Sequence, residues 1–342
     1  MVSEGAAQSL ADLGETGLLR RVFALLPAGD LTSVGPGDDA AVVAAPDGRV
    51  VATTDMLVEG RDFRRDWSSA ADVGWKAAVQ NLADVAAMGA VPTALLVSLA
   101  APPDTDVAWA LDLCRGLAAA CAGTGVGVVG GDLSAAPQVV VSVTALGHLQ
   151  GRQPVLRSTA RPGDVVAVAG HLGRSAAGLA LLQAERSEVA PSLVAAHRRP
   201  TPPLAAGPAA AVAGATAMLD VSDGLLRDLG RVADASGVTV DLREASGPSP
   251  VAAWQDALLG AASALRHDAR RAHALCREWV FSGGEDHALV ACFPRGAAVP
   301  VGFAVVGDVL PRLTGRPGVV LDGGGTWDGA GGWDHFERHV GH

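Results

Sequence analysis

The chain has 342 residues, of which 49% are apolar and 18% are charged, and its formal net charge is −10. This composition excludes a disordered chain, and the length predicts two domains, which we place at residues 1–150 and 151–342. The acidic balance argues against nucleic acid as a partner, because proteins that bind a phosphate backbone usually carry basic patches.

Cysteine spacing and hydropathy exclude several further classes. The four cysteines form no CxxC pair, and Cys114 and Cys121 lie on an apolar helical pattern, which favours buried free thiols over a metal site. The N-terminal residues show no signal-peptide pattern, and no charge-free run reaches the roughly 18 apolar residues of a membrane helix. We therefore expect a cytoplasmic protein that does not bind a membrane.

Hydrophobic periodicity predicts alternating helices and strands in the first half of the chain. The expected helices are Glu15–Leu26, Ala71–Met88 and one that runs from an N-cap at Asp104 to about Cys121, and the expected strands are Ala40–Ala44, Arg49–Thr54 and Gln138–Leu146. Because a turn joins the first two strands, we expect Asp39 and Asp55 to lie in one sheet region.

The second half follows the same alternation after Arg157–Asp164, which reads as a linker. Expected strands are Val165–Ala169, Ala217–Val221, Val238–Leu242, His287–Phe293, Val305–Val309 and Val319–Leu321. Expected helices are one from about Arg174 to Ala184, 204–213, Gly224–Ala235 with Ser222 or Asp223 as its cap, and Val251–Leu265. His197–Pro203 is expected to be a solvated loop. The pattern predicts an α/β or α+β two-domain enzyme.

One stretch, Val51–Gly60, has unusual chemistry for a strand. It reads as a short β-branched strand that ends in Thr53, Thr54 and Asp55, which are side chains of the oxygen type that hard cations prefer. Other carboxylates stand among glycines and small residues. They are Asp38, Asp39, Asp84, Asp132, Asp220, Asp223, Glu285 and Asp286. We interpret the set as a site for Mg²⁺ and phosphate.

Asp84 illustrates the alternatives. Lys76, Gln80 and Asp84 stand four residues apart and share a helix face, which by itself also fits an ordinary solvated stripe. However, the segment Val79–Met88 holds no other formal charge, whereas solvated faces usually carry several. This setting favours a role for Asp84 in binding.

Familiar phosphate-binding and hydrolase motifs are missing from the sequence. The only lysine, Lys76, is not part of a Walker A loop, and no protein-kinase catalytic loop or Gly-x-Ser-x-Gly elbow occurs. Gly125–Gly130 matches G-x-G-x-x-G by letters, but it follows a helix and enters a strand, which is the wrong context for a dinucleotide fingerprint. His171, His197, His267, His273, His339 and His342 read as surface or loop residues. What remains is carboxylates and glycine turns, a set suited to positioning and neutralising phosphates.

Taken in order, the acidic motifs closely resemble the thiamine-monophosphate kinase family. The matching segments span nearly the whole chain. They are Gly37–Ala41, Thr53–Gly60, Asn81–Ala90, Gly130–Asp132, Asp220–Leu225, Ser282–Asp286 and Trp333–Phe336. Each segment alone is weak evidence, but the ordered set is specific.

The resemblance implies a fold similar to that of aminoimidazole-ribonucleotide synthetase, with an N-terminal dimerising sheet domain and a C-terminal α/β domain. It implies a homodimer and transfer of the ATP γ-phosphoryl group to thiamine monophosphate. It assigns Mg²⁺ to Asp39, Thr53, Thr54, Asp55, Asp84, Asp132, Asp220 and Asp223. It assigns ATP to Gly131, Asp132, Arg157 and Ser222, and the substrate to Glu285, to Trp333 by stacking, and to position 62. No general base is needed, because a phosphomonoester is already ionised near neutral pH (second pKa about 6).

Two departures from the family pattern leave alternatives open. Asp62 stands where the family usually has a histidine that contacts substrate, and an early Gly-Glu-Phe motif reads Gly14-Glu15-Thr16. The alternatives are another ATP-dependent synthetase of the same superfamily, of the selenophosphate or aminoimidazole-ribonucleotide type, and a catalytically silent nucleotide-binding dimer. The Gly-Gly-Glu-Asp and Trp-Asp-His-Phe segments disfavour the first. The otherwise complete acid set disfavours the second.

Overall fold

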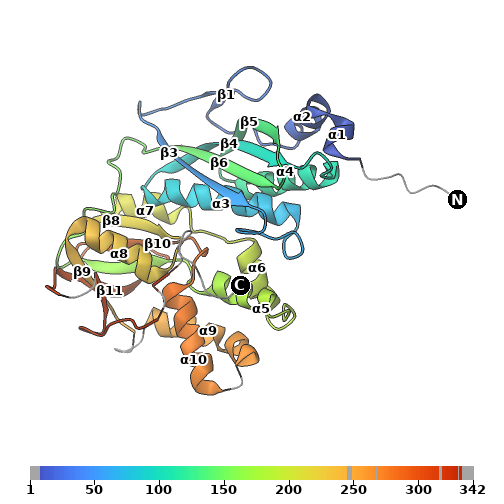
Figure 1. The fold of residues 1–342 in the computed structure, drawn as a ribbon. Helices are drawn as coiled ribbons and strands as arrows, with labels where there is room; N and C mark the ends of the chain where they lie inside the picture. Colours follow the sequence, from blue (N-terminus) through green and yellow to red (C-terminus); the bar gives the residue numbers. More distant parts are fainter. Residues whose placement is uncertain (1–7, 245–248, 267, 316–317, 330, 333–342) are drawn as a thin grey trace. The chain divides into compact units, whose positions relative to one another are not determined.

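The computed structural model describes residues 8–244, 249–266, 268–315, 318–329 and 331–332. The chain forms two compact units, one of Met1–Val85 with Ala90–Gly151 and one of Ala86–Gly89 with Arg152–His342. Both units combine helices with a β-sheet, so the predicted two-domain α/β class is confirmed (Figure 1). None of the helices in the described ranges is long and apolar enough to cross a membrane.

The first unit is built on a four-stranded sheet of order β3-β6-β4-β5. Figure 1 shows α3 and α4 along one face of this sheet. The helices are α1 Leu10–Leu13, α2 Glu15–Phe23, α3 Ala70–Ala87 and α4 Val107–Cys121. The strands are β3 Val51–Val58, β4 Val91–Ala101, β5 Gly127–Ala135 and β6 Val140–His148, with β1 Thr32–Val34 and β2 Val42–Val43 in a separate two-stranded sheet.

Three predictions for this unit need correction. Asp39 and Asp55 do not share a sheet region, because Asp39 follows the β1 strand and Asp55 lies in β3 of the other sheet. Thr53, Thr54 and Asp55 do not end their strand, because β3 continues to Val58 by pairing with β6 along its whole length. The N-cap of α4 is Asp106 rather than Asp104, since the Asp106 carboxylate accepts a hydrogen bond from the Ala108 N–H at 2.8 Å.

Helix α3 is buried on most of its surface, which explains its alanine-rich sequence. Gly74 of α3 and Gly116 of α4 make the crossing of these helices close, because a Cβ at either position would lie about 2 Å from a carbonyl of the other helix. Three polar side chains are buried with the apolar ones, namely Lys76 (4% exposed), Gln80 (8%) and Asn81 (0%). Lys76 is the single lysine of the chain. A buried polar group needs hydrogen-bond partners, so the polar contacts of these three residues matter as well as their packing.

The second unit is built on a six-stranded sheet of order β12-β9-β11-β7-β10-β8, in which β12 and β9 alone are parallel. Its strands are β7 Val165–Ala169, β8 Ala217–Val221, β9 Val238–Leu242, β10 Ala288–Phe293, β11 Phe303–Pro311 and β12 Val319–Leu321. Its helices are α5 Arg174–Gln183, α6 Pro191–Arg198, α7 Ala206–Val212, α8 Leu225–Ser236, α9 Pro250–Leu265 and α10 Ala269–Ser282.

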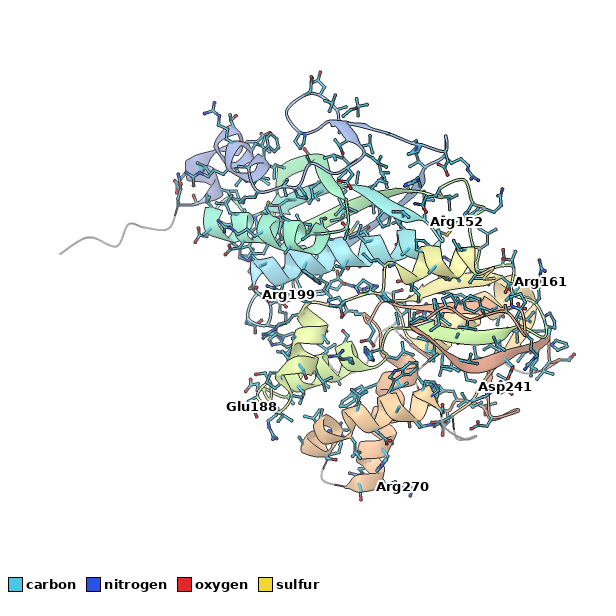
Figure 2. All side chains as sticks on the ribbon, turned by 180° about the vertical axis from the view of Figure 1, so that it is seen from behind. Arg152, Arg161, Glu188, Arg199, Asp241 and Arg270 are labelled. Carbon is cyan, nitrogen blue, oxygen red and sulfur yellow. The ribbon has the colours of Figure 1, made fainter. Side chains whose placement is uncertain are left out.

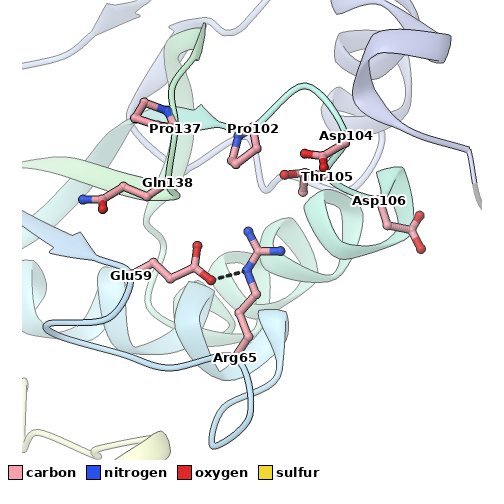
Figure 3. A pocket seen from close by; sticks show the side chains of 8 residues that line it. All are labelled: Glu59, Arg65, Pro102, Asp104, Thr105, Asp106, Pro137 and Gln138. Atoms are coloured by element: carbon pink, nitrogen blue, oxygen red, sulfur yellow. Dashed lines mark ion pairs between the residues drawn. The ribbon is translucent and has the colours of Figure 1, made fainter.

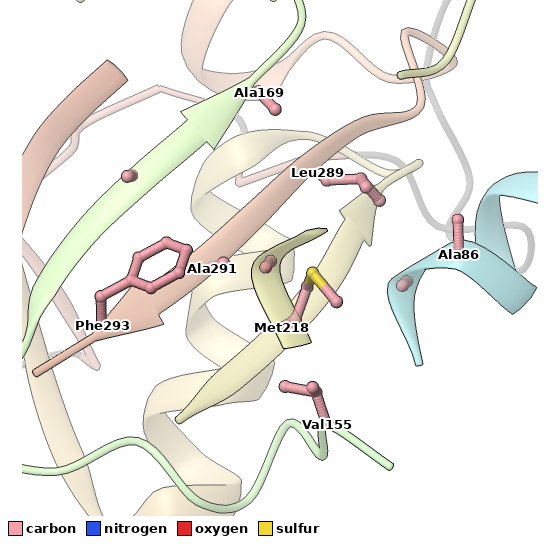
Figure 4. Packing of buried hydrophobic residues seen from close by; sticks show 10 residues of the cluster. Ala86, Val155, Ala169, Met218, Leu289, Ala291 and Phe293 are labelled. Carbon is pink, nitrogen blue, oxygen red and sulfur yellow. The ribbon is translucent and has the colours of Figure 1, made fainter. Parts of the chain in front are cut away.

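Small residues fill the core of this unit on one side of the sheet. Ala169, Met218, Leu289 and Ala291 pack together there, and Phe293 adds an aromatic contact with Phe303 at 5.5 Å between ring centroids (Figure 4). Charged side chains such as Glu188 and Arg270 lie on the outside of the unit instead (Figure 2). Four of the six predicted strands here, β7, β8, β9 and β12, have the predicted bounds.

Other expectations for the second unit were wrong. The predicted linker Arg157–Asp164 belongs to the unit, because Gly163 N–H donates to the Val309 carbonyl at 2.8 Å and Thr216 Oγ1 donates to the Asp164 carboxylate at 2.6 Å. Helices α6 and α10 were not predicted. Helix α8 begins after Gly224 without a side-chain cap, so neither Ser222 nor Asp223 caps it.

The four cysteines are buried and free, as expected for Cys114 and Cys121. Burial raises the pKa of Cys114 to about 11 and that of Cys121 to about 12. Thiols with such high pKa values are poor nucleophiles, so the cysteines are structural.

Candidate active site

In the first unit, the predicted residues of β3 are attached to helix α3. Thr53 Oγ1 donates to the Asp84 carboxylate at 2.8 Å, and the Asp55 backbone N–H donates to Asn81 Oδ1 at 2.9 Å. Asn81 is completely buried, and its amide also donates to the Ala77 carbonyl at 2.9 Å. Asn81 therefore acts as a clamp that sets the position of Asp55 relative to Asp84, whereas the Asp55 side chain itself is exposed.

The register of the sheet separates the predicted metal ligands into two groups. Thr53 and Asp55 lie opposite Ala145 and Val143, which are fully buried, so they belong to the helix-covered face. Thr54 lies opposite Thr144 on the other face, and their hydroxyls are 3.0 Å apart. Asp132 shares this second face through its alignment with Ser98 and Ser142.

Side chains on opposite faces leave the sheet in opposite directions, so the strand register does not gather these residues around one ion. The described residues also contain no group of three or more His, Cys, Asp or Glu side chains that could hold a metal ion. Asp39 is exposed in the loop between β1 and β2. Position 131, just before Asp132, must be glycine, because a Cβ there would lie 1.8 Å from the Val97 carbonyl oxygen.

Asp62, which replaces the family histidine, closes the turn after β3. Its carboxylate accepts from the Val58 N–H at 2.8 Å, and its own N–H donates to the Val58 carbonyl at 2.9 Å. A carboxylate that bonds backbone groups two to four residues away is a common turn-forming device. Asp62 therefore has a structural role in this turn, which the sequence pattern alone did not reveal.

A pocket of about 500 Å³ lies beside this turn, and none of the predicted site residues lines it. Its wall includes Glu59 and Arg65, which form an ion pair with 2.8 Å between Oε1 and Nε (Figure 3). The guanidinium of Arg65 also lies 4.8 Å from the centroid of the Trp109 ring. These contacts hold Glu59 in place near the end of β3.

In the second unit, two loops that carry predicted residues are joined backbone to backbone. Glu285 N–H donates to the Ser222 carbonyl at 2.8 Å, and His287 N–H donates to the Val221 carbonyl at 3.1 Å. A Cβ on Gly284 would lie 2.4 Å from the Ser222 carbonyl, so only glycine permits this approach. The two loops therefore form one structural unit, and Ser222 and Glu285 have a fixed relative position.

Asp223 belongs to a closed ring of hydrogen bonds. Its N–H donates to Asp228 Oδ2 at 3.0 Å, Asp228 Oδ1 accepts from Arg231 at 2.6 Å, and Arg231 donates to Asp223 Oδ2 at 2.5 Å. Asp228 is fully buried, and this burial, with the nearby charge of Asp220, raises its pKa to about 7. The ring orients Asp223 before any ligand contributes.

Asp220 is buried at the end of β8 and is paired with a histidine. Its Oδ2 lies 3.2 Å from Nδ1 of His287, which is also buried. A histidine that bonds one oxygen of a metal-binding carboxylate fixes the orientation of the other oxygen. Residues that hold metal ligands in this way are common in metal sites.

The remaining predicted residues of this unit are Arg157 and Trp333. Arg157 is exposed, and its carbonyl accepts a hydrogen bond from the Ser236 hydroxyl at 3.0 Å. Trp333 lies outside the described residues.

The comparisons with known proteins decide the family. Residues 37–149 match the family model described as AIR synthase related protein, N-terminal domain, and residues 161–278 match its C-terminal domain. A thiamine-monophosphate kinase of Mycobacterium tuberculosis is 48% identical over 328 residues, which cover 96% of this chain and 93% of that protein. The chain belongs to the thiamine-monophosphate kinase family.

Solved structures of thiamine-monophosphate kinases agree. The structure from Stenotrophomonas maltophilia K279a has a TM-score of 0.72 at 29% identity and covers 90% of this chain and 96% of that chain. A structure described as AaThiL complexed with AMPPCP and TMP has a TM-score of 0.72 at 31% identity and covers 97% of this chain and 100% of that chain. The predicted resemblance to this kinase family and the aminoimidazole-ribonucleotide-synthetase-like fold are both confirmed.

Sequence reasoning missed several residues that support the predicted thiamine-monophosphate kinase site. Asp228 and Arg231 hold Asp223, His287 holds Asp220, and Asn81 holds Asp55. The sequence could have indicated a buried role for Asp228, because this charged residue stands on the same helix face as the apolar, buried Leu225 and Val232. The others become visible only when the partner strand or loop is known.

The donor set of this family member fits Mg²⁺ by its chemistry. The predicted ligands are all carboxylate or hydroxyl oxygens, which a hard cation prefers, and they include no thiolate or imidazole. Asp39, Asp55 and Asp132 are also exposed, so ligands can reach them. This fit supports the magnesium prediction, which remains a prediction.

Proposed function

We propose that this chain phosphorylates thiamine monophosphate with ATP, giving thiamine diphosphate. The observation that carries the proposal is the 48% identity over 96% of the chain to a thiamine-monophosphate kinase. It is supported by the structural likeness, over the whole of the other chain, to a protein in complex with the ATP analogue AMPPCP and TMP. The chain is on this proposal a phosphotransferase whose acceptor is a phosphate group.

The predicted site residues fall into three groups, according to whether they bind Mg²⁺, ATP or the substrate. We assign Mg²⁺ to Asp39, Thr53, Thr54, Asp55, Asp84, Asp132, Asp220 and Asp223, ATP to Gly131, Asp132, Arg157 and Ser222, and the substrate to Asp62, Glu285 and Trp333. When bound, Mg²⁺ supplies the positive charge that the phosphates of donor and acceptor require. The protein's net charge of −10 makes such a cation necessary, because carboxylates alone would repel both substrates.

Positioning is the main contribution of the protein in this mechanism. Phosphoryl transfer needs the attacking and leaving oxygens in line and little covalent participation by side chains. The Asn81 clamp, the Asp223–Asp228–Arg231 ring and the Asp220–His287 pair each fix one predicted ligand before substrates bind. The acceptor phosphate is ionised near neutral pH, so no catalytic base is assigned.

The first experiment is product formation from ATP, Mg²⁺ and thiamine monophosphate, with free thiamine as a parallel acceptor. Thiamine diphosphate from the monophosphate alone supports the proposal. Turnover only with a different phosphorylated acceptor would instead favour another synthetase of the superfamily. ATP binding without any product would favour a silent nucleotide-binding dimer.

Single-residue variants test the site assignment. Asp55→Asn and Asp84→Asn are expected to lower kcat by at least about 100-fold, on the order of 3 kcal/mol, because each removes one charge from a metal ligand. Asp112→Asn, which changes an exposed acid of α4 that forms an ion pair with Arg115 of the same helix, is the matched control and should retain activity. Circular dichroism checks that the fold is kept. Near-normal kcat in both site variants would contradict the assignment.

A homodimer through the first unit is part of the proposal. In the described part of this unit, α3 and α4 lie along the other face of the sheet (Figure 1), and the face that carries Thr54 exposes Met56 (59%) and Leu96 (38%) among small polar side chains. An open sheet face with exposed apolar side chains is typical of an interaction surface. Light scattering after gel filtration tests this, and a monomer at micromolar concentration would contradict it.

A further inference from the structure

Two adjacent carboxylates leave the turn between α10 and β10 in different directions. Asp286 accepts hydrogen bonds from the N–H groups of Gly173 at 2.6 Å and Ser175 at 2.8 Å, at the first turn of α5. Glu285 Oε2 lies 3.4 Å from Nδ1 of His197, near the end of α6. One carboxylate therefore attaches the turn to α5, and the other is in contact with α6.

His197 is buried, which contradicts its prediction as a loop or surface residue. It is 6% exposed, and its Nδ1 also lies 3.1 Å from the hydroxyl of Ser175, which is itself buried. A carboxylate can only accept hydrogen bonds, so the contact with Glu285 is attractive when Nδ1 carries a proton. Ser175 Oγ lies against the same nitrogen, so a protonated Nδ1 shares its one N–H between the serine hydroxyl and Glu285, and the serine keeps this edge of the ring at the carboxylate.

Glu285 has a fixed backbone and a long side chain. Its φ of +63° is in the left-handed region, which non-glycine residues adopt at a cost of about 1 kcal/mol or more. The N–H bond to Ser222 described above maintains this conformation. The side chain is 36% exposed, so without a partner it would sample several rotamers and lose entropy when it bound a ligand.

We propose that His197 is a positioning residue that orients the Glu285 carboxylate for the thiamine part of the substrate. Asp286 sets the first turn of α5, Ser175 on that turn sets the ring of His197, and His197 sets Glu285. The inference rests on the proposed function, in which Glu285 contacts the cationic thiamine moiety. It adds a role for a residue that does not itself touch substrate, and it predicts an effect confined to one of the two substrates.

The test compares steady-state kinetics of the full chain with His197→Leu and His197→Asn variants. His197→Leu fills the space without a hydrogen-bond donor and should raise KM for thiamine monophosphate about tenfold, which corresponds to about 1.4 kcal/mol. KM for ATP should stay within about twofold, because the contact concerns one substrate. His197→Asn places an amide donor near the position of Nδ1 and should recover most of the lost affinity.

Two further variants keep the test decisive. His273→Leu changes a histidine that is exposed on α10 and should leave both KM values unchanged. Should His197→Leu fail to fold, Ser175→Ala removes the hydroxyl that orients the ring and should raise KM for thiamine monophosphate about threefold, with KM for ATP constant. An equal rise in both KM values, or equal effects of the Asn and Leu variants, would mean a structural role and overturn the inference.

The outcomes also separate this inference from the proposed function. If the unmodified chain forms thiamine diphosphate and His197→Leu has an unchanged KM for thiamine monophosphate, the positioning role alone is wrong. If the unmodified chain forms no thiamine diphosphate, the proposed function is wrong and the role of His197 falls with it.

Discussion

Replacement of Asn81 by alanine should destabilise the first unit by about 3 kcal/mol. The side chain is fully buried, and its two hydrogen bonds, to the Asp55 N–H and the Ala77 carbonyl, are each 2.9 Å long. Loss of a typical bond costs about 1 kcal/mol, and leaving the Asp55 N–H without this acceptor adds about 1 kcal/mol. A cavity of roughly 40 Å³ adds about 1 kcal/mol more at about 24 cal/mol per Å³.

Urea unfolding followed by circular dichroism measures this change, with the transition of the first unit analysed separately. Gln138→Ala, at an exposed position of the same unit, is the control and should shift the midpoint little. Because the clamp sets Asp55 relative to Asp84, kcat should fall even at temperatures where Asn81→Ala remains folded. A loss of less than about 0.5 kcal/mol would show that the clamp does not stabilise the sheet, and an unchanged kcat would show that it does not position Asp55.

Two further predictions concern the second unit. The pKa of Asp228 is raised from 3.8 to about 7 in the folded protein. Between pH 3.8 and about 7 the native state therefore holds a proton that the unfolded state has lost, and the free energy of unfolding falls as the pH rises through this range. Unfolding of Asp228→Asn against wild type should therefore show the variant gaining about 2–4 kcal/mol relative to wild type from pH 5 to pH 8, whereas parallel pH curves would contradict this. Gly284→Ala should cost about 1–3 kcal/mol and lower activity, because the new Cβ would lie 2.4 Å from the Ser222 carbonyl. Gly230→Ala in α8, with open space around it, should be neutral or slightly stabilising by the same unfolding assay, and equal costs would refute the steric argument.

Much of the fold could be predicted because its elements carry strong local patterns. Helix α3 has an apolar sequence on most of its faces, and β7 and β9 are short β-branched runs between turns. These signals are independent of the rest of the chain. The acidic motifs were also visible, since carboxylates next to glycines stand out against a chain with 18% charged residues.

Features that depend on distant contacts could not be predicted in the same way. Strand β3 extends to Val58 because β6 supplies hydrogen bonds along its length, and the sequence after Asp55 reads as a turn. Helix α6 lacks a side-chain cap and has only eight residues, so its pattern is weak. The burial of His197 depends on α5 and on the turn before β10, which lie more than 20 and 80 residues away in the sequence.

The same limit applies to the candidate site. Its acids could be identified because they stand next to glycines and small residues. The sheet register, however, decides that Thr53 and Asp55 lie on one face of the sheet and Thr54 and Asp132 on the other. Because side chains alternate along a strand, adjacent residues of one motif serve different faces. A motif written as letters therefore predicts which residues take part, and the register decides which of them share a surface.

The single lysine of the chain offers a chemical probe of the first unit. The ε-amine of Lys76 belongs to a side chain that is 4% exposed within α3, whereas every other basic side chain apart from histidine is an arginine. An acylating reagent that modifies lysine amines would therefore react at this position only when the helix opens. The rate of its modification, followed by mass spectrometry of the peptide that contains Lys76 so that acylation of the N-terminal amine is counted separately, would report the free energy of that opening at one defined site. Substrates that order the β3–α3 region should slow the labelling, so ligand binding could be read from acylation kinetics without any engineered label.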